Sequence, residues 1–271
     1  MTTHFAPADT AVVRVAGEDA AVFLQGQCTA DLRAVASADA LWLNRKGRVL
    51  AHTVVSKEAD GSFLLLAPRL SAEALIAVVT ANVIADDVVA TDESARWQRW
   101  VAWGEAPAVA AARVFATQRY GVPAWDVLSP AGSSLPGVRA DLAELDLPRV
   151  QAGVPSVPED CGANEFPQEC GLEAWVSYTK GCYLGQEVMA RIQSMGSLRR
   201  ILRRVDSIDG SPVSAGAELA ADGKVVGKVR SAAGPHGLAL VALDLPVGTV
   251  CATVGGGVVL GAPAAMPPAR S

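Results

Sequence analysis

The chain has 271 residues, 51% apolar and 19% charged, so it can bury a sizeable core and does not have the composition of a disordered protein. Its net charge of −5 argues against direct nucleic-acid binding, which normally uses a basic surface. The five cysteines are widely spread and form no C-x-x-C pair. This pattern argues against a disulfide framework or a thiolate metal site, and it predicts reduced thiols.

The beginning of the chain and its most apolar stretch bear on targeting. Residues 1–20 lack the basic start and the apolar run of a signal peptide. Polar residues interrupt the apolar stretch at 74–90, so it is not expected to span a membrane. We therefore expect a soluble, cytoplasmic protein without a membrane anchor, and we expect it to be a monomer.

The first third of the chain reads as an alternation of strands and helices. The patterns predict a strand at 10–17, a short helix at 18–26, a hairpin at 40–56 that turns at 44–47, a strand at 62–68, a helix at 71–82 and a strand that follows it. Ser71 is placed to cap the second helix, and Glu73 lies in its first turn. This order suits an α+β fold with helices on one face of a sheet.

A weaker version of the same order follows. It consists of a strand at 100–104, a helix at 106–116, a strand at 124–128 and a helix around 140–147. We interpret the two halves as related lobes, at about 1–95 and 96–197. The segment 151–180 is long and irregular, and such a segment in a compact domain is usually functional.

The pattern changes again near residue 198. Short β-type runs separated by Gly, Pro and Asp predict a small barrel or sandwich at 198–262. The end of the chain, 263–271, is expected to be a frayed tail.

The stretch SYTKGCYLGQEVMARIQ, at 177–193, contains the first candidate site. Gly181 and Gly185 free the backbone around Cys182, Lys180 brings a positive charge, and a helix is expected to begin after Gly185. A nearby ammonium and a helix N-terminus both lower the pKa of a thiol, which makes it more reactive. The alternative is a glycine turn in which the thiol only fills space. No histidine lies near Cys182 in the sequence, which argues against a Cys-His dyad.

The octapeptide KGCYLGQE, at 180–187, resembles the signature of the YgfZ-type folate-binding proteins, which are relatives of the glycine-cleavage T-protein. Further segments resemble that family in the same order: LQGQCTAD within 17–32, NRKGRVLAHTVV at 44–55, VQAGVPSVPED at 150–160, the approach to the signature at 165–183, and DGKVVGKVRSAAGPHGLAL at 222–240. The resemblance is weakest between 95 and 145.

The resemblance implies a fold of two interleaved ferredoxin-like lobes plus a C-terminal β-barrel, with a channel for tetrahydrofolate or a derivative. It implies a role in assembly or repair of iron–sulfur clusters in client enzymes, including some that modify tRNA, with client or assembly proteins as partners. The chemistry would lie with Cys182 and Lys180. The folate contacts implied by the resemblance are Gln151, Tyr183, Gln186, Glu187 and Arg191.

The sequence departs from the family pattern in three features, and these departures leave alternative functions open. Gln151 stands where the family often has a glutamate, and it cannot form a charged pair. Ala51 and His52 stand where T-proteins carry an aspartate pair, which disfavours an aminomethyl transferase without excluding a tetrahydrofolate-dependent enzyme. Cys170 is either a resolving partner for Cys182 or incidental. A third alternative is a scaffold that binds a client and does no chemistry.

Overall fold

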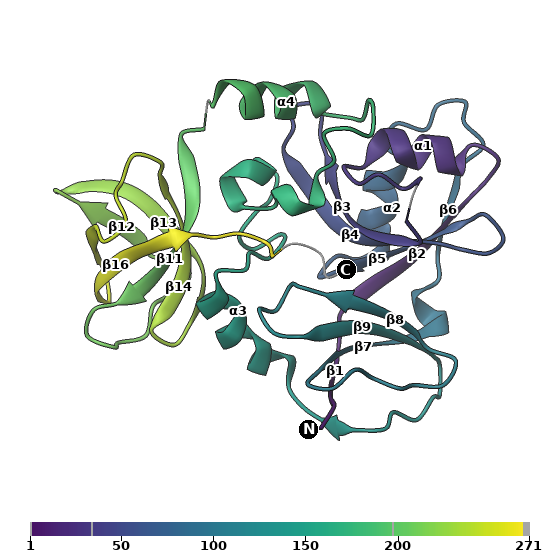
Figure 1. Cartoon of the computed structure of the whole chain (residues 1–271), viewed down its shortest axis with the longest axis horizontal. Coiled ribbons are helices and arrows are strands. Elements are labelled where there is room, and N and C mark those ends of the chain that lie inside the picture. The colour runs from purple at the N-terminus through teal and green to yellow at the C-terminus, as the bar shows by residue number, and fades with distance from the viewer. Residues whose placement is uncertain (1, 34, 197, 268–271) are drawn as a thin grey trace.

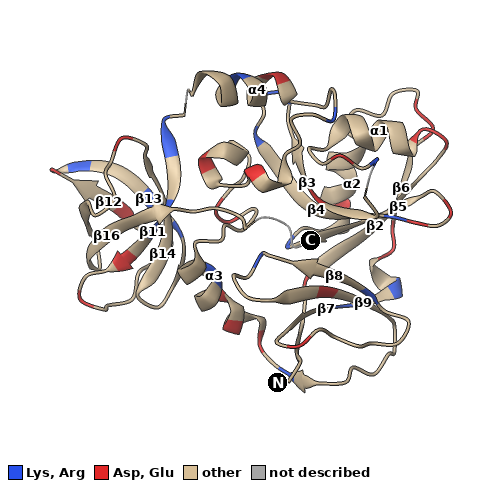
Figure 2. Ribbon diagram, viewed as in Figure 1, with Lys and Arg blue, Asp and Glu red and all other residues tan. Residues whose placement is uncertain are grey.

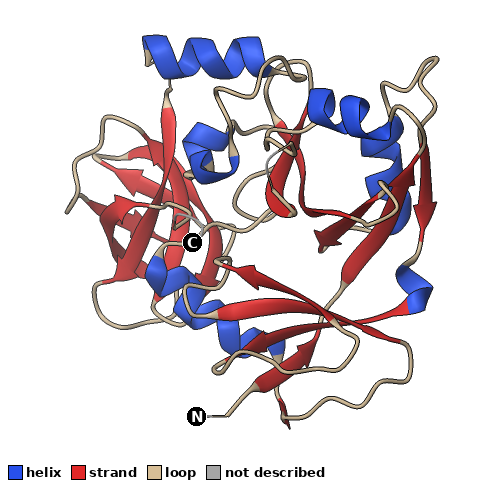
Figure 3. Ribbon diagram, turned by 45° about the vertical axis from the view of Figure 1, so that its right-hand side comes forward, coloured by secondary structure: helices blue, strands red, loops and turns tan. Residues whose placement is uncertain are grey.

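The computed structural model of the chain describes residues 2–33, 35–196 and 198–267. These residues form two five-stranded sheets and a closed six-stranded barrel, which lies to one side of the sheets (Figure 1). The irregular segment between α3 (Asp146–Ala152) and α4 (Gln186–Met195) lies among the three units (Figure 3). Within the described residues, no helix is long and apolar enough to cross a membrane.

The first sheet has the strand order β3-β4-β5-β2-β6, and we call it and its helices lobe one. Its elements are β2 (Thr10–Ala16), α1 (Ala20–Gln27), β3 (Ser37–Leu43), β4 (Val49–Lys57), β5 (Phe63–Pro68), α2 (Ala72–Thr80) and β6 (Val89–Asp92). Both helices pack on one face, where Leu24 and Leu75 join Leu65 in one buried cluster. The Ser71 side chain accepts a hydrogen bond from the Ala74 amide, which confirms the predicted cap.

The second sheet has the order β10-β1-β7-β9-β8, and we call it and the following helices lobe two. Its elements are β1 (His4–Pro7), η1 (Ser94–Arg96), β7 (Trp97–Trp103), β8 (Arg113–Thr117), β9 (Ala124–Pro130), β10 (Val138–Arg139), η2 (Leu142–Leu145) and α3 (Asp146–Ala152). The first strand of the chain thus pairs with β7 in lobe two. The lobes are interleaved, as the resemblance implied, and residues 4–7 lie outside lobe one.

The helix expected at 106–116 is wrong. Residues 113–117 form β8, which pairs with β9, and Ala111 takes a positive φ of 56° just before it. The alanines favour a helix locally. Pairing with β9 brings the Phe115 side chain into the cluster between the sheets, and this tertiary contact overrides the local preference.

The two sheets pack face to face on the sides that α1 and α2 do not cover. Val12, Leu64 and Leu66 of lobe one share a buried cluster with Leu128 of lobe two, and Trp97 and Phe115 pack against it. The opposite face of the lobe two sheet carries Phe5, Trp100 and other buried side chains, with residues from loops packed on them.

The barrel has the closed strand order β11-β14-β13-β12-β15-β16. Its strands are β11 (Arg200–Ser207), β12 (Glu218–Ala221), β13 (Lys224–Ala233), β14 (His236–Ala242), β15 (Val250–Thr253) and β16 (Gly256–Pro263), around a core that includes Val205, Leu219 and Leu260. The predicted barrel is confirmed.

The chain continues past β16 into a buried position. Ala264 and Met266 lie in the cluster beneath the irregular segment, and the Met266 amide donates to the Gly171 carbonyl at 2.8 Å. The frayed end expected from 263 is therefore wrong for these residues, and 268–271 lie outside the described residues.

Candidate functional site

The signature segment 180–187 is held against the hairpin turn of lobe one. Gly181 and Gly185 have φ values of 98° and 83°, and Gly185 precedes α4 (Gln186–Met195). A Cβ on Gly185 would lie 2.8 Å from the Asn44 carbonyl oxygen and 3.2 Å from the Gly47 Cα. Glycine is therefore required here both by the backbone conformation and by the close approach of the hairpin.

The segment and the residues just before it also dock on the end of α1 and the loop after it, which together carry LQGQCTAD. The Leu184 amide donates to the Gly26 carbonyl at 3.0 Å, and the Ser177 amide donates to the Thr29 carbonyl at 2.9 Å. The Thr29 hydroxyl donates to the Trp175 carbonyl at 2.7 Å. Three motifs that are far apart in the sequence thus meet on lobe one.

Lys180 is buried in this junction. Its Nζ donates to the Cys28 carbonyl at 2.8 Å and also to the Ala30 carbonyl, and it lies 5.4 Å from the centre of the Tyr183 ring. Burial lowers the pKa of this ammonium. No contact of Lys180 with Cys182 occurs among the described residues. The expected pairing of ammonium and thiol is thus replaced by a structural role, in which Lys180 ties the signature to lobe one.

Cys182 is exposed, whereas the other four cysteines are buried and free. Burial raises the pKa of the Cys28 thiol and of the Cys161 thiol, which makes both poor nucleophiles at neutral pH. Cys182 lies at the surface four positions before α4 begins. It is the thiol that a reagent or a partner protein can reach.

Cys170 is fully buried and does not pair with Cys182. Its thiol donates to the Asp160 carbonyl at 3.4 Å, and Cys161 lies in the same buried cluster. Cys170 as a resolving partner is therefore not compatible with this structure, in which one thiol is enclosed and the other is at the surface.

The five residues expected to contact folate do not meet in one pocket. Tyr183 is buried in the core beneath the signature, and burial raises the pKa of its phenol to about 12. Gln186 accepts a hydrogen bond from the Tyr183 amide at 3.3 Å. Glu187 and Arg191 form an exposed ion pair at 2.8 Å on the outside of α4. Gln151 is exposed and contacts the His236 ring of the barrel at 3.0 Å.

A different set of residues lines a slit of about 30 Å³ between the lobes and the irregular segment. The set includes His52, Arg69, Arg119, Tyr120, Arg149 and Trp175. A second hollow, of about 280 Å³, is lined by Asp31, Asp39, Gln118 and again Trp175. The Trp175 indole is therefore part of the wall between the two hollows.

His52 is enclosed on both sides. Its Nε2 lies 2.7 Å from an Asp39 carboxylate oxygen, and its ring stacks on Trp175 with 4.1 Å between the ring centres. Burial lowers the pKa of His52 despite the nearby carboxylate, so the ring is neutral at pH 7. No carboxylate was expected beside His52 from the sequence, whereas Asp39 of β3 lies next to it in the structure. The signal was available, because Asp39 and Leu41 share a face and Leu41 pairs with His52 across the hairpin.

The guanidinium groups of the slit are all paired with carboxylates. Arg119 forms a buried ion pair with Asp126, and Arg149 donates to Asp160 at 2.9 Å. Arg69 contacts Glu159 at 2.9 Å. Glu159 and Asp160 end the segment VQAGVPSVPED, but the sequence did not indicate their arginine partners.

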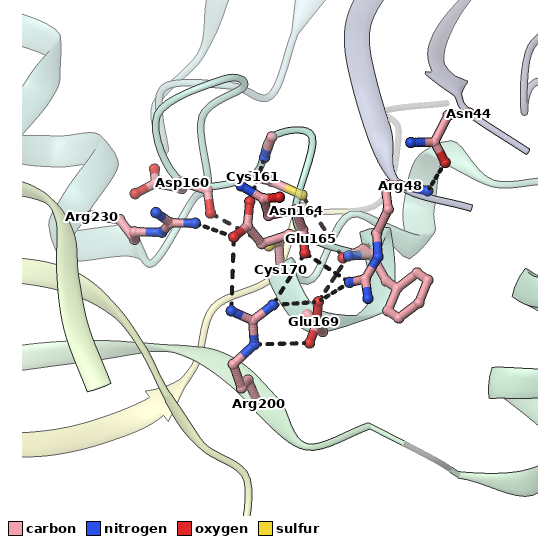
Figure 4. A network of polar contacts seen from close by, with 12 residues as sticks. Asn44, Arg48, Asp160, Cys161, Asn164, Glu165, Glu169, Cys170, Arg200 and Arg230 are labelled. Carbon is pink, nitrogen blue, oxygen red and sulfur yellow. Dashed lines mark hydrogen bonds and ion pairs between the residues drawn. The ribbon is translucent and has the colours of Figure 1, made fainter. Parts of the chain in front are cut away.

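A second polar network holds the irregular segment to both of its neighbours (Figure 4). The buried Glu169 carboxylate accepts from Arg48 of lobe one and from Arg200 of the barrel, both at 3.2 Å. Glu165, also buried, pairs with Arg230 of the barrel. We call these residues the latch, because they join lobe one, the irregular segment and the barrel.

Charge and metal-ligand groups do not mark a further site. Residues of both signs are interspersed along all three units (Figure 2). Over 2–33, 35–196 and 198–267, no three His, Cys, Asp or Glu side chains gather as a metal centre would require.

Comparison with known proteins agrees with this architecture. The family model for the CAF17 C-terminal β-barrel domain matches residues 198–267. A crystal structure of the glycine cleavage system aminomethyltransferase T from Bartonella henselae has the same fold, with a TM-score of 0.81 over 98% of this chain and 86% of that chain, at 17% identity.

Two curated relatives are similar over most of the chain. The human mitochondrial iron-sulfur cluster assembly factor IBA57 is 31% identical over 265 residues, which cover 85% of this chain and 74% of that protein. The tRNA-modifying protein YgfZ of Edwardsiella ictaluri is 28% identical over 223 residues, covering 70% and 66%. The chain therefore belongs to the YgfZ/IBA57 family of T-protein-like proteins.

Proposed function

We propose that the protein is a folate-binding accessory factor for the assembly or repair of iron–sulfur clusters in client enzymes, including tRNA-modifying ones, and that it acts through Cys182. The observation that carries the proposal is the single exposed thiol, presented by a signature that is fixed to lobe one through two other motifs, the hairpin turn and LQGQCTAD. The names of the relatives, a cluster assembly factor and a tRNA-modifying protein, point to the same area of biology.

One thiol suits a transient role with a cluster as cargo. Clusters are normally held by four cysteine thiolates, so Cys182 can supply one ligand while a partner or client supplies the others. When Cys182 binds iron, its thiol loses a proton and becomes a thiolate. When the cluster is transferred, a thiolate of the client replaces the Cys182 thiolate on the iron. An exposed position is needed for this exchange, and the buried thiols of Cys28, Cys161, Cys170 and Cys251 do not offer it.

The slit between the lobes is the proposed folate site. Its side chains suit a folate, because Trp175 and Tyr120 offer flat surfaces. Arg69 is exposed and, beside its pair with Glu159, has further N–H groups for a carboxylate of the ligand. At about 30 Å³ the slit is too small for a pterin. We propose that Trp175 swings away from His52 on binding, which joins the slit to the neighbouring hollow of about 280 Å³.

The thiol is tested by alkylation of the native protein with mass-spectrometric mapping. Cys182 should be modified first, and the buried cysteines only after unfolding. Cys182→Ser should abolish support of client enzymes in cells with little change in stability, because the site is exposed. Cys251→Ser is the matched control, and it should retain cellular function. Equal alkylation of Cys182 and Cys251 in the native state would exclude the proposed role.

Folate binding is tested by calorimetry with tetrahydrofolate, together with tryptophan fluorescence. We expect binding that changes the fluorescence, because Trp175 leaves the His52 ring. Trp175→Phe should retain binding and lose that change. No heat at about 1 mM tetrahydrofolate, which is a weak affinity by protein standards, would remove folate from the proposal and leave the thiol role standing.

A second candidate is a tetrahydrofolate-dependent aminomethyl transferase, which the T-protein fold favours. Asp39 also favours this candidate, because its carboxylate lies 2.7 Å from the His52 Nε2, where no acid was expected from the sequence. The assay is formation of methylene-tetrahydrofolate from an aminomethyl-lipoyl carrier protein. We expect no turnover. Turnover that survives Cys182→Ala and is lost in Asp39→Asn would establish the transferase in place of the accessory factor.

We also propose that the protein works as a monomer in the cytoplasm. The five free thiols support a reducing compartment. Sedimentation of the purified chain and fractionation of the cells that produce it test the two parts separately.

A further inference from the structure

A hollow of about 270 Å³ lies in lobe two, on the sheet face turned away from lobe one. It is lined by Phe5, Gln98, Trp100, Ser133, Leu135, Gly137 and Arg139. None of these residues belongs to the signature, the slit or the latch. The space equals about nine liquid-water volumes, enough for a small organic molecule.

The hollow exists because loops cover this sheet face where lobe one has helices. Val109, Ala112 and Leu135 pack on the face from the segments before β8 and after β9. Gly137 brings the second segment onto the sheet, since a Cβ there would lie 2.7 Å from the Phe5 ring. The loops therefore contact the sheet tightly at Gly137 and leave a space beside it, which is the hollow.

Two side chains of the lining have a buried polar atom without a partner within the described residues: the Gln98 Oε1 and the Trp100 indole N–H. The Ser129 hydroxyl, which does not line the hollow, is also without a partner there. Gln98 and Trp100 are two positions apart on β7, and Ser129 is directly opposite Gln98 on β9, so all three point to the same face. Trp100 is only 8% exposed. Buried polar groups are nearly always hydrogen-bonded, so the Gln98 amide and the Trp100 N–H can each take a partner from a molecule in the hollow.

A positively charged side chain, Arg139, lines the same hollow. The Arg139 guanidinium lies 5.2 Å from the centre of the Trp100 ring, and it has no carboxylate partner in the described chain. The other arginine stacked on a tryptophan of this sheet differs in this respect. Arg113 lies 5.3 Å from the Trp97 ring and is paired with Glu58.

We propose that this hollow binds a small organic carboxylate with a flat apolar body, of about the size of benzoate. The carboxylate would accept from Arg139 and from the Trp100 N–H, and the Gln98 amide can turn to donate as well. The body would lie against Phe5 and Leu135. A phosphate suits the site less, because there is one cation and the walls are apolar.

The test uses the full chain and three probes: benzoate, benzamide and acetate. Benzamide keeps the ring without the charge, and acetate keeps the charge without the ring. We expect benzoate to bind with a dissociation constant on the order of 1 mM or below, and both analogues at least tenfold more weakly. In a nitrogen–proton NMR spectrum, the Trp100 indole N–H signal, assigned with Trp100→Phe, should shift with benzoate.

Arg139→Gln should weaken benzoate binding at least tenfold, while the matched control Arg113→Gln should leave it unchanged. The same NMR spectra show that each variant is folded, and the wild-type Trp100 signal carries the test if a variant does not fold. A Trp100 signal that does not move with benzoate would mean that the hollow holds only water. Unchanged binding in Arg139→Gln, or equal binding of benzamide, would also overturn the proposal. None of these outcomes depends on folate or on Cys182.

Discussion

The two lobes have five-stranded sheets that face one another, but they are covered differently on their outer sides. In lobe one, α1 and α2 bury one side of the sheet, and the loop after α1 holds the signature. In lobe two, loops cover the corresponding side and leave buried polar atoms without partners. In lobe one, the helices and the loop after α1 support the segment that carries Cys182. In lobe two, the loops on the sheet leave space for a small ligand.

The polar contacts of the barrel follow the same division, while α3 of lobe two also packs on the barrel through the buried side chain of Val150. Lobe one reaches it through the buried carboxylate of Glu169, with Arg48 on one side and Arg200 on the other. On the side of lobe two, the exposed Gln151 contacts His236. Buried charge pairs are costly to break, and exposed contacts are not. Four predictions follow from this asymmetry, from the largest effect to the smallest.

Glu169→Ala should lower the free energy of unfolding by about 3 kcal/mol, at the low end for a buried pair because Arg48 and Arg200 are partly exposed. Gln151→Ala, on the side of lobe two, should cost less than about 0.5 kcal/mol. Chemical denaturation of the two variants measures the difference. Equal losses would show that the polar contacts of the two lobes hold the barrel alike.

Lys180→Met should destabilise the protein by about 2 kcal/mol, because it leaves the buried carbonyls of Cys28 and Ala30 without their donor. Lys46→Met, at an exposed position in the neighbouring hairpin turn, is the control and should be neutral. Denaturation curves again provide the measurement. If Lys180→Met were as stable as the control, Lys180 would not be the tie between the signature and lobe one.

Val13→Ala and Val127→Ala remove the same two carbons from fully buried positions in the two lobes. We expect a loss of about 2 kcal/mol for Val13, under the helices, and about 1 kcal/mol for Val127, because loops relax into a cavity more readily. Thermal or chemical unfolding gives both values. A larger loss at Val127 would contradict the view that lobe two has the softer cover.

The smallest effect concerns His52. Because burial lowers its pKa in the folded protein, the unfolded chain takes up this proton more readily. The contribution to stability is therefore complete above about pH 6.5 and is lost as the pH falls through the window below it. His52→Gln should lose less stability than the wild type between about pH 7.5 and about pH 5.5.

Gln118→Ala, at the neighbouring hollow, is the control for this measurement, since it removes no ionisable group. Its pH dependence should follow that of the wild type. If His52→Gln and the wild type had parallel pH profiles, the His52 ring would not be withheld from protonation by the fold.

Much of the fold follows from short-range patterns. The hairpin around 44–47, the helix capped by Ser71 and the C-terminal barrel all form where the sequence places them. Each depends on alternation, turn residues or a cap, which are properties of neighbouring residues. The eight-residue signature, together with the other segments that follow the family's order along the chain, was sufficient to indicate the family.

The directions of the side chains were decided by the tertiary structure alone. The sequence put Lys180 two residues from Cys182, but the ammonium turns to carbonyls of the loop after α1. It put Gln151 near a ligand loop, but the side chain faces the barrel. A pattern of neighbours predicts helices, turns and hairpins, since the hydrogen bonds of these elements join residues that are close in the sequence. The partner of a buried charge is fixed by desolvation, and only the assembled fold determines which groups are removed from water together.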